Sequence, residues 1–307
     1  MKVFVAGATG AVGRHLVPQL VAAGHEVTAT TRSQGKLAGL REAGAEPVLL
    51  DGLDAMAVGQ AVARAAPEVI IHEMTAIPPD MDLRHFDRTF AATNRLRTTG
   101  LDHLLAAASA AGVHRFLAQS FAGWPAIRTG GPVKTEDDPL DPSPPAGQRE
   151  TFRAIKHLEQ AVTSAPLEGL VLRYGGLYGP GASQEMVTMV RRRRVPIIGA
   201  GTGVWSFLHI TDAAGATVAA VERGAPGLYN VADDEPAPVA QWLPALAAAA
   251  GAKPPLRLPL WLGRLAAGDA AVSMMTQVRG ASNAKAKREL SWKPAWPTWR
   301  DGFRDWV

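Results

Sequence analysis

A glycine-rich turn near the N-terminus is the first group of residues whose types and spacing could do chemistry. Gly7, Gly10 and Gly13 recur at every third position, after the apolar run 2–6 and before a segment of helical periodicity, 15–21. Glycines at such a turn let backbone N–H groups approach a pyrophosphate, and the following helix N-terminus adds partial positive charge. The turn therefore predicts a dinucleotide site formed by Gly7, Thr9, Gly10, Ala11, Val12 and Gly13.

The end of the second predicted strand, 26–31, indicates which dinucleotide binds. The sequence there is Thr31-Arg32-Ser33, with Lys36 one turn later and no acidic residue. An acidic residue at this place would hold the ribose 2'-hydroxyl of NAD, whereas an arginine suits the 2'-phosphate of NADP. We therefore expect NADP, with NAD possible, and contacts from Thr31, Arg32, Ser33 and Lys36.

Two motifs together resemble those of a known family. The glycine spacing is Gly-x-x-Gly-x-x-Gly, and residues 172–181 read Leu-Arg-Tyr-Gly-Gly-Leu-Tyr-Gly-Pro-Gly. The chain resembles, over nearly its whole length, the atypical branch of the extended short-chain dehydrogenase/reductases, which is NAD-dependent epimerase/dehydratase-like. The resemblance implies an α/β fold, with a Rossmann-type doubly wound parallel sheet and a smaller C-terminal substrate-binding cap.

The resemblance also implies further cofactor contacts. Asp51 and Gly52 follow the third strand, where relatives bind adenine. The segment Glu73-Met74-Thr75 follows the fourth strand, where relatives pass the backbone beneath the nicotinamide ribose. Asn94 matches the asparagine that opens the long central helix of the family.

The catalytic residues that the resemblance implies are incomplete. Ser120 stands at the end of the fifth strand, in the place of the family's catalytic serine, and Lys156 matches the lysine of a Tyr-x-x-x-Lys motif. The tyrosine of that motif is replaced by Phe152, which has no hydroxyl. In relatives the lysine ammonium lowers the pKa of the tyrosine, so that the phenol exchanges a proton while hydride moves. Lys156 is still expected to hold the cofactor ribose.

Tyr174 on the sixth strand is a candidate replacement for the missing proton donor. It stands where the family pattern has a proline, next to the expected nicotinamide site, and is expected both to take part in catalysis and to contact the cofactor. Packing as a half-buried aromatic residue is the alternative role for this side chain.

Alternating apolar patterns predict the elements that must position these residues. Five strands are expected after the first, at 26–31, 47–50, 69–72, 116–119 and 169–173. Helices are expected between them at 35–43, 55–65, 93–111 and 150–163. We expect residues 1–180 to form the NAD(P)-binding Rossmann domain and 181–307 to form mainly the cap, with 206–235 returning to the Rossmann domain.

Composition limits the class of protein. The chain has 307 residues, a net charge of +4, no cysteine and one cationic run, Arg191 to Arg194. Without cysteine there are no disulfides and no thiolate chemistry, which suits the cytoplasm. The eight histidines show no paired spacing, so no metal is expected. Neither a membrane span nor nucleic-acid binding is expected, and the chain is expected to be a monomer or homodimer.

These observations favour an NADP-dependent oxidoreductase that reduces a carbonyl, imine or activated alkene in a hydrophobic small molecule. The apolar segments 258–262 and 272–275 of the expected cap favour a hydrophobic substrate. Three alternatives remain open. They are an epimerase or dehydratase with retained NAD(P), a non-catalytic NADP-binding regulator resembling NmrA-like proteins, and a cofactor-independent lyase or isomerase on the same scaffold.

Overall fold

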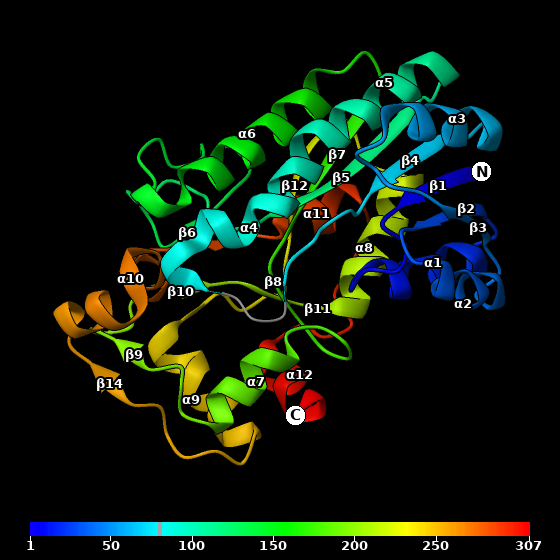
Figure 1. The fold of residues 1–307 in the computed structure, drawn as a ribbon. Coiled ribbons are helices and arrows are strands. Elements are labelled where there is room, and N and C mark those ends of the chain that lie inside the picture. The colour runs from blue at the N-terminus through cyan, green and yellow to red at the C-terminus, as the bar shows by residue number, and fades with distance from the viewer. Residues whose placement is uncertain (79–81) are drawn as a thin grey trace.

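Seven parallel strands form the central sheet of the larger lobe, in the order β12-β7-β5-β4-β1-β2-β3. The computed structural model describes residues 1–78 and 82–307 (Figure 1). The strands are β1 (Lys2–Ala6), β2 (Glu26–Thr31), β3 (Glu46–Leu49), β4 (Val69–His72), β5 (Arg115–Phe121), β7 (Glu168–Tyr174) and β12 (Gly227–Val231). The α/β doubly wound fold expected from the sequence is confirmed.

The strands are buried on both faces because helices cover the sheet from both sides. Every residue of β4 is buried, as are residues 3–6 of β1, which is typical of parallel sheets. One face is covered by α1 (Gly13–Ala22), α2 (Leu37–Glu42) and α8 (Ile210–Glu222). The other face is covered by α3 (Ala55–Ala65), α5 (Leu101–Ala111) and α6 (Arg149–Ser164).

The prediction of one continuous central helix at 93–111 is wrong in where the helix starts and in its being an uninterrupted α-helix. Helix α4 runs from Phe86 to Arg95, a π-helical turn follows at Leu96–Gly100, and α5 continues from Leu101. Phe90 and Phe86 extend the buried face of the helix one and two turns upstream of the predicted start, and their rings stack with centroids 4.5 Å apart. Asn94 is therefore near the end of α4 and does not open the helix.

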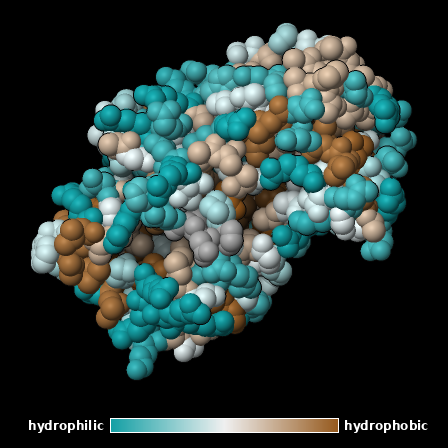
Figure 2. Space-filling model, viewed as in Figure 1, coloured by the Kyte–Doolittle hydropathy of each residue, from teal (hydrophilic) through white to brown (hydrophobic). Residues whose placement is uncertain are grey.

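The smaller lobe is built mainly from the C-terminal third of the chain. Its helices are α7 (Gln184–Arg191), α9 (Val239–Ala249), α10 (Leu260–Thr276) and α12 (Trp299–Trp306). Its short strands are β9 (Ile197–Ile198), β10 (Val204–Trp205), β13 (Ala237–Pro238) and β14 (Arg257–Leu258). Trp242, Trp299 and Phe303 are fully buried in its core. Figure 2 shows hydrophobic atoms gathered at the end where α10 lies, where Trp261 and Leu265 are exposed.

Several short elements tie the lobes together. Strand β8 (Gly176–Tyr178) pairs with β11 (Phe207–His209), and β6 (Val133–Lys134) pairs with β15 (Gly280–Ala281). Helix α11 (Ala284–Glu289) then packs beside β12, which is itself the edge strand of the central sheet. Of the helices in residues 1–78 and 82–307, none is long and apolar enough to cross a membrane.

A buried ion pair fixes α6 against the sheet. Glu159 accepts hydrogen bonds from Arg173 Nε at 2.8 Å and Nη2 at 2.6 Å, and from the hydroxyl of Ser120 at 2.8 Å. All three residues are at most 5% exposed. The bidentate pair joins the helix to β7, and the serine joins it to β5.

We expect Glu159→Ala to lower the free energy of unfolding by about 3–5 kcal/mol, because it leaves the Arg173 guanidinium buried without a counter-ion. Denaturant titration followed by circular dichroism measures this difference. Glu150→Ala is the matched control, since Glu150 lies on the same helix with a largely exposed side chain and should change stability by no more than about 0.5 kcal/mol. A similar loss in both variants would contradict the role given to the pair.

Candidate active site

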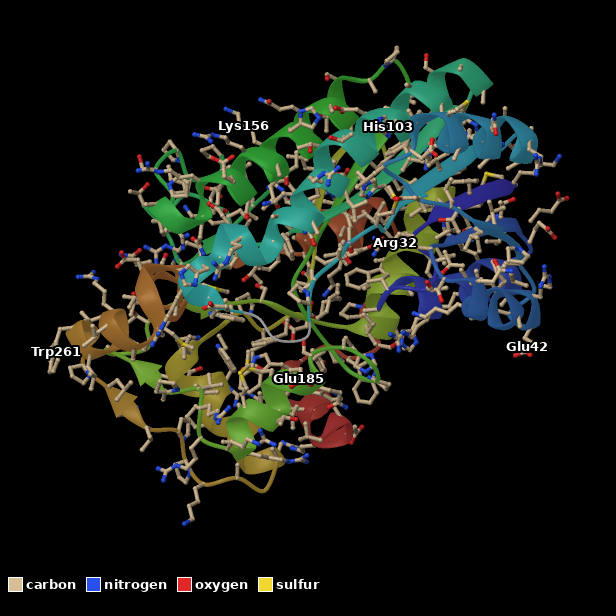
Figure 3. All side chains as sticks on the ribbon, viewed as in Figure 1. Arg32, Glu42, His103, Lys156, Glu185 and Trp261 are labelled. Carbon is tan, nitrogen blue, oxygen red and sulfur yellow. The ribbon has the colours of Figure 1, made fainter. Side chains whose placement is uncertain are left out.

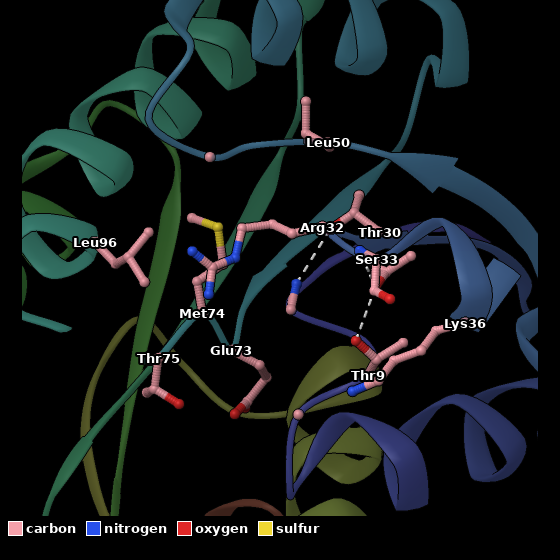
Figure 4. A pocket seen from close by; sticks show the side chains of 14 residues that line it. Thr9, Thr30, Arg32, Ser33, Lys36, Leu50, Glu73, Met74, Thr75 and Leu96 are labelled. Atoms are coloured by element: carbon pink, nitrogen blue, oxygen red, sulfur yellow. Dashed lines mark hydrogen bonds between the residues drawn. The ribbon is translucent and has the colours of Figure 1, made fainter. Parts of the chain in front are cut away.

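A pocket of about 270 Å³ opens at the carboxyl ends of β1, β2 and β4 (Figure 4). The sheet order reverses between β1 and β4, which is where open α/β sheets bind ligands. Eleven of the lining residues were predicted from the sequence: Gly7, Thr9, Gly10, Thr31, Arg32, Ser33, Lys36, Gly52, Glu73, Met74 and Thr75. Thr30, Leu50 and Leu96 complete the lining and were not predicted.

The glycine turn has the shape that a pyrophosphate needs. Gly7 has φ of +95°, and a Cβ at this position would lie 2.7 Å from the carbonyl carbon of Glu73. At Gly13, where α1 begins, a Cβ would lie 2.4 Å from the carbonyl oxygen of Ala8. The turn therefore fits a dinucleotide, with backbone N–H groups and the helix N-terminus directed toward its phosphates. Ala11, Val12 and Gly13 shape the turn without lining the pocket.

The end of β2 supplies the basic side of the pocket. The hydroxyls of Thr9 and Thr31 lie 3.0 Å apart, and the backbone N–H of Ser33 donates to Thr31 Oγ1 at 3.2 Å. Arg32 and Lys36 are exposed at the lining. Figure 4 shows Lys36 beside Thr9 and Ser33, and the guanidinium of Arg32 extending toward Met74. Within the part of the chain that the structure describes, neither cation lies within ion-pair distance of a carboxylate.

The apolar side of the pocket forms where β3 ends and α4 meets α5. A Cβ at Gly52 would lie 2.3 Å from the sulfur of Met74, so this glycine admits the methionine that lines the pocket. Asp51 is exposed and outside the lining, and its Oδ1 accepts from the backbone N–H of Leu53 at 3.1 Å. Leu50 directly follows β3, and Leu96 lies in the π-helical turn. At both places the apolar pattern of the sequence does not distinguish a pocket residue from a core residue.

A buried hydrogen-bond network lies behind the pocket at Glu73. The hydroxyl of Tyr174 donates to Glu73 Oε1 at 2.9 Å and lies 2.5 Å from the hydroxyl of Thr217. Burial raises the pKa of Glu73 to about 8, against the opposing effect of the Tyr174 hydrogen bond. Burial and then the charge of Glu73 also raise the pKa of Tyr174. Glu73 lines the pocket but Tyr174 does not, so the structure places the tyrosine hydroxyl against Glu73 and away from the pocket surface.

The register expected for α6 needs a correction. Phe152 is buried against Trp124, with ring centroids 5.2 Å apart, whereas Lys156 is exposed and points away from the pocket (Figure 3). Thr151, Ile155 and Glu159 follow one another at intervals of four residues along α6, and each is at most 5% exposed. Glu159 holds this line of residues against β5 and β7 through Ser120 and Arg173. Lys156 is one residue out of that line and does not line the pocket.

The hydroxyls near the strand ends already have protein partners. Thr151 donates to Asp87 Oδ1 at 2.8 Å and accepts from the amide of Asn94 at 3.0 Å. Ser120 donates to Glu159 and lies outside the pocket lining. Since Ile155 cannot carry charge, the face of α6 toward the strand ends offers no phenol and no ammonium group.

Two further ionisable side chains lie close to the strand ends. His72 is completely buried, and desolvation lowers its pKa, while Nε2 lies 3.0 Å from the carbonyl oxygen of Leu96. Arg97 is 2% exposed and its guanidinium carbon lies 4.6 Å from the centroid of the Phe121 ring. The sequence analysis missed Arg97, although an arginine on the apolar face of a long helix is an unusual feature. In residues 1–78 and 82–307, no three His, Asp or Glu side chains cluster as metal ligands.

Known proteins resemble this chain in sequence and fold. The model of the NAD dependent epimerase/dehydratase family matches residues 3–232. The 3-diazoavenalumate denitrifying reductase of a Streptomyces species is 46% identical over 314 residues, covering 99% of each chain. A ketoreductase of Stigmatella aurantiaca, which acts on a 4-hydroxy-2-methyl-3-oxo-4-farnesyl-3,4-dihydroquinoline-1-oxide, is 26% identical over 87% of this chain and 79% of its own.

The UDP-glucose 4-epimerase of Thermotoga maritima has the same fold, with a TM-score of 0.75, 23% identity, and coverage of 99% of this chain and 96% of its own. The similarities to curated reductases and the intact dinucleotide turn identify an NAD(P)-dependent reductase of a small molecule. The chain belongs to the NAD dependent epimerase/dehydratase family.

Proposed function

We propose that this protein uses NADPH to remove a diazo group reductively from an aromatic substrate. The observation that carries the proposal is the face of α6 toward the strand ends, where Thr151 and Ile155 replace any phenol and ammonium pair. Such a site suits an electrophile that accepts hydride without a positioned acid. The 46% identical Streptomyces relative, named for reduction of a diazo compound, supports this choice of electrophile.

The chemistry balances without a proton donor. When bound, the reduced nicotinamide supplies one hydride. Addition of that hydride to the terminal nitrogen of a cationic arenediazonium group gives a neutral diazene. Loss of N2 then leaves the hydrogen on the ring carbon, so one diazonium group and one hydride give one arene C–H bond and one N2. The residues of this chain are needed to bind both partners, orient them and exclude water.

The basic end of β2 supports NADPH as the reductant. Arg32 and Lys36 line the pocket with no carboxylate partner in the described residues, and Glu73 is the one carboxyl group among the fourteen lining residues. A 2'-phosphate would gain a charge-assisted hydrogen bond from Arg32 that a 2'-hydroxyl cannot match.

A second candidate function is reduction of a carbonyl, imine or activated alkene, with Glu73 as proton donor. The Tyr174–Glu73 hydrogen bond favours it, because Glu73 lines the pocket and its pKa of about 8 keeps it protonated near neutrality. In this candidate Tyr174 is a positioning residue that acts through Glu73. The ketoreductase from Stigmatella aurantiaca is the relative that supports it.

NADPH should bind at least about tenfold more tightly than NADH, since one charge-assisted contact to the phosphate contributes roughly 1.5–3 kcal/mol. Arg32→Ala should remove most of this difference and leave NADH affinity nearly unchanged. Isothermal titration calorimetry with both nucleotides measures the four dissociation constants. Arg41→Ala, which changes the same charge on α2 outside the lining, is the matched control. Equal affinities of the wild type for NADPH and NADH would end the assignment.

The wild type should release one N2 for each NADPH oxidised when it is given a hydroxylated arenediazonium carboxylate. With NADPH deuterated on the transferred hydrogen, mass spectrometry should find one deuterium on the ring carbon that carried nitrogen. The same mixture without protein measures the uncatalysed background. NADPH-dependent reduction of a ketone or enone, without N2 release from any diazo arene, would favour the second candidate and overturn the first.

Glu73→Gln should change the pH dependence of stability. Because burial raises the folded-state pKa of Glu73 from 4.5 to about 8, the unfolded chain ionises first as pH rises, and the stability that the buried, protonated carboxyl group provides is lost progressively through that window. The variant should therefore gain stability relative to the wild type between pH 5 and pH 8, on the order of 1 kcal/mol for each pH unit. Denaturant titrations at both pH values measure the difference. A constant offset between the two proteins would show that Glu73 ionises in its ordinary range.

A further inference from the structure

Arg97 is a buried cation that has no counter-ion among the residues described by the structure. Its side chain is 2% exposed, and Nε and Nη1 are completely buried with no hydrogen-bond partner among the residues described. The guanidinium stacks on the ring of Phe121, 4.6 Å from its centroid. Stacking on an aromatic face offsets part of the lost hydration but satisfies none of the five N–H donors.

Arg173 gives an internal comparison for this burial. It is 5% exposed, and Glu159 holds it through two hydrogen bonds of 2.8 and 2.6 Å. No carboxylate of the described chain plays this part for Arg97, and burial lowers the pKa of Arg97 to about 9. Leaving a buried charge unpaired costs several kcal/mol, which a folded protein tolerates chiefly where a ligand supplies the partner.

The position of Arg97 links it to the pocket. Leu96, its neighbour in the π-helical turn, lines the pocket, and Phe121 is the last residue of β5 at the same carboxyl edge of the sheet. One turn upstream, Thr93 Oγ1 accepts from the backbone N–H of Ala76, directly after the lining residue Thr75. Arg97 itself is outside the lining, but its neighbour Leu96 and its stacking partner Phe121 place it beside the pocket at the carboxyl edge of the sheet.

The Phe121 ring on which Arg97 stacks belongs to an aromatic cluster. Phe121 packs on Trp124 at 5.4 Å, and Trp124 packs on Phe152 at 5.2 Å and on Phe86 at 5.7 Å. This aromatic cluster comes from β5, the segment after it, α6 and α4. A flat ring with an anionic substituent matches the cluster and the guanidinium together.

We propose that Arg97 is the counter-ion for the carboxylate of an aromatic substrate and so determines substrate specificity. The proposal deepens the proposed function and rests on it for the statement that the ligand is the substrate of the reduction. Glu73 does not compete for Arg97, because its carboxyl group is held by Tyr174 and is uncharged below about pH 8.

Calorimetric binding of an unreactive aromatic acid to the NADP⁺-saturated protein tests the proposal. The probes are 4-hydroxycinnamate and its primary amide, which differ in charge and hardly in size. The wild type should bind the acid at least about tenfold more tightly than the amide, and Arg97→Met should reduce that ratio to about twofold or less. Arg95→Met is the matched control, since Arg95 is an exposed arginine two residues away on α4, and it should keep the wild-type ratio.

Thermal unfolding distinguishes ligand binding from a structural role. Arg97→Met should unfold at the same temperature as the wild type or higher, because it removes an unpaired buried charge, whereas a structural cation would lower it. If Arg97→Met does not fold, Arg97→Lys takes its place in the test. The lysine keeps the charge, so this variant should retain part of the preference for the acid. Survival of the full acid preference in Arg97→Met, or no preference in the wild type, overturns the proposal.

The same measurements separate this inference from the proposed reaction. An acid preference that depends on Arg97, with no N2 release from any diazo arene, upholds the anion site and overturns the diazo reduction. N2 release by the wild type, with an acid preference that survives Arg97→Met, does the reverse.

Discussion

The close approach between Gly7 and the backbone of Glu73 is the constraint on which the site depends. It leaves no room for a Cβ, and so it fixes the first turn of the chain against the segment that follows β4. That contact lies at the point where the sheet order reverses, so the phosphate-binding turn and the residues beneath the second ligand form one rigid edge. Met74 fills the space that Gly52 leaves, which extends the same edge to β3.

Burial determines the charge state and the partners of the ionisable side chains at this edge as much as ion pairing does. Arg173 has a carboxylate partner, Arg97 has an aromatic ring in place of one, and Glu73 is kept neutral by burial. A low dielectric strengthens whatever interaction a ligand then makes with the unpaired guanidinium. Among the fourteen lining residues, Arg32 and Lys36 supply positive charge, and the carboxyl group of Glu73 is uncharged near pH 7.

The fold and most of the dinucleotide pocket could be predicted from the sequence, whereas the register of α6 could not. The buried strands and the glycine turn are local signals, since each is complete within a few residues. Phe152 and Lys156 are four residues apart, but so are Thr151 and Ile155, and a helix with a broad buried face accommodates both pairs. Only Glu159, pairing with a distant Arg173, shows which line faces the strands. The start of α4 was missed for a related reason, because the π-helical turn interrupts the 3.6-residue period.

The corrected register changes what kind of substrate the site can reduce. With a phenol and an ammonium group, a site can protonate an alkoxide as hydride arrives, so a neutral carbonyl suffices as acceptor. With Thr151 fully hydrogen-bonded and Ile155 beside it, the acceptor must itself carry the positive charge that hydride neutralises, or Glu73 must give up its proton. An arenediazonium carboxylate meets the first condition, and its negative group matches the unpaired cation at Arg97. Under the proposed function, the lack of a phenol and an ammonium group on this line of α6 and the unpaired guanidinium of Arg97 among the described residues have one explanation, namely a zwitterionic aromatic substrate that supplies its own electrophile and its own anchor.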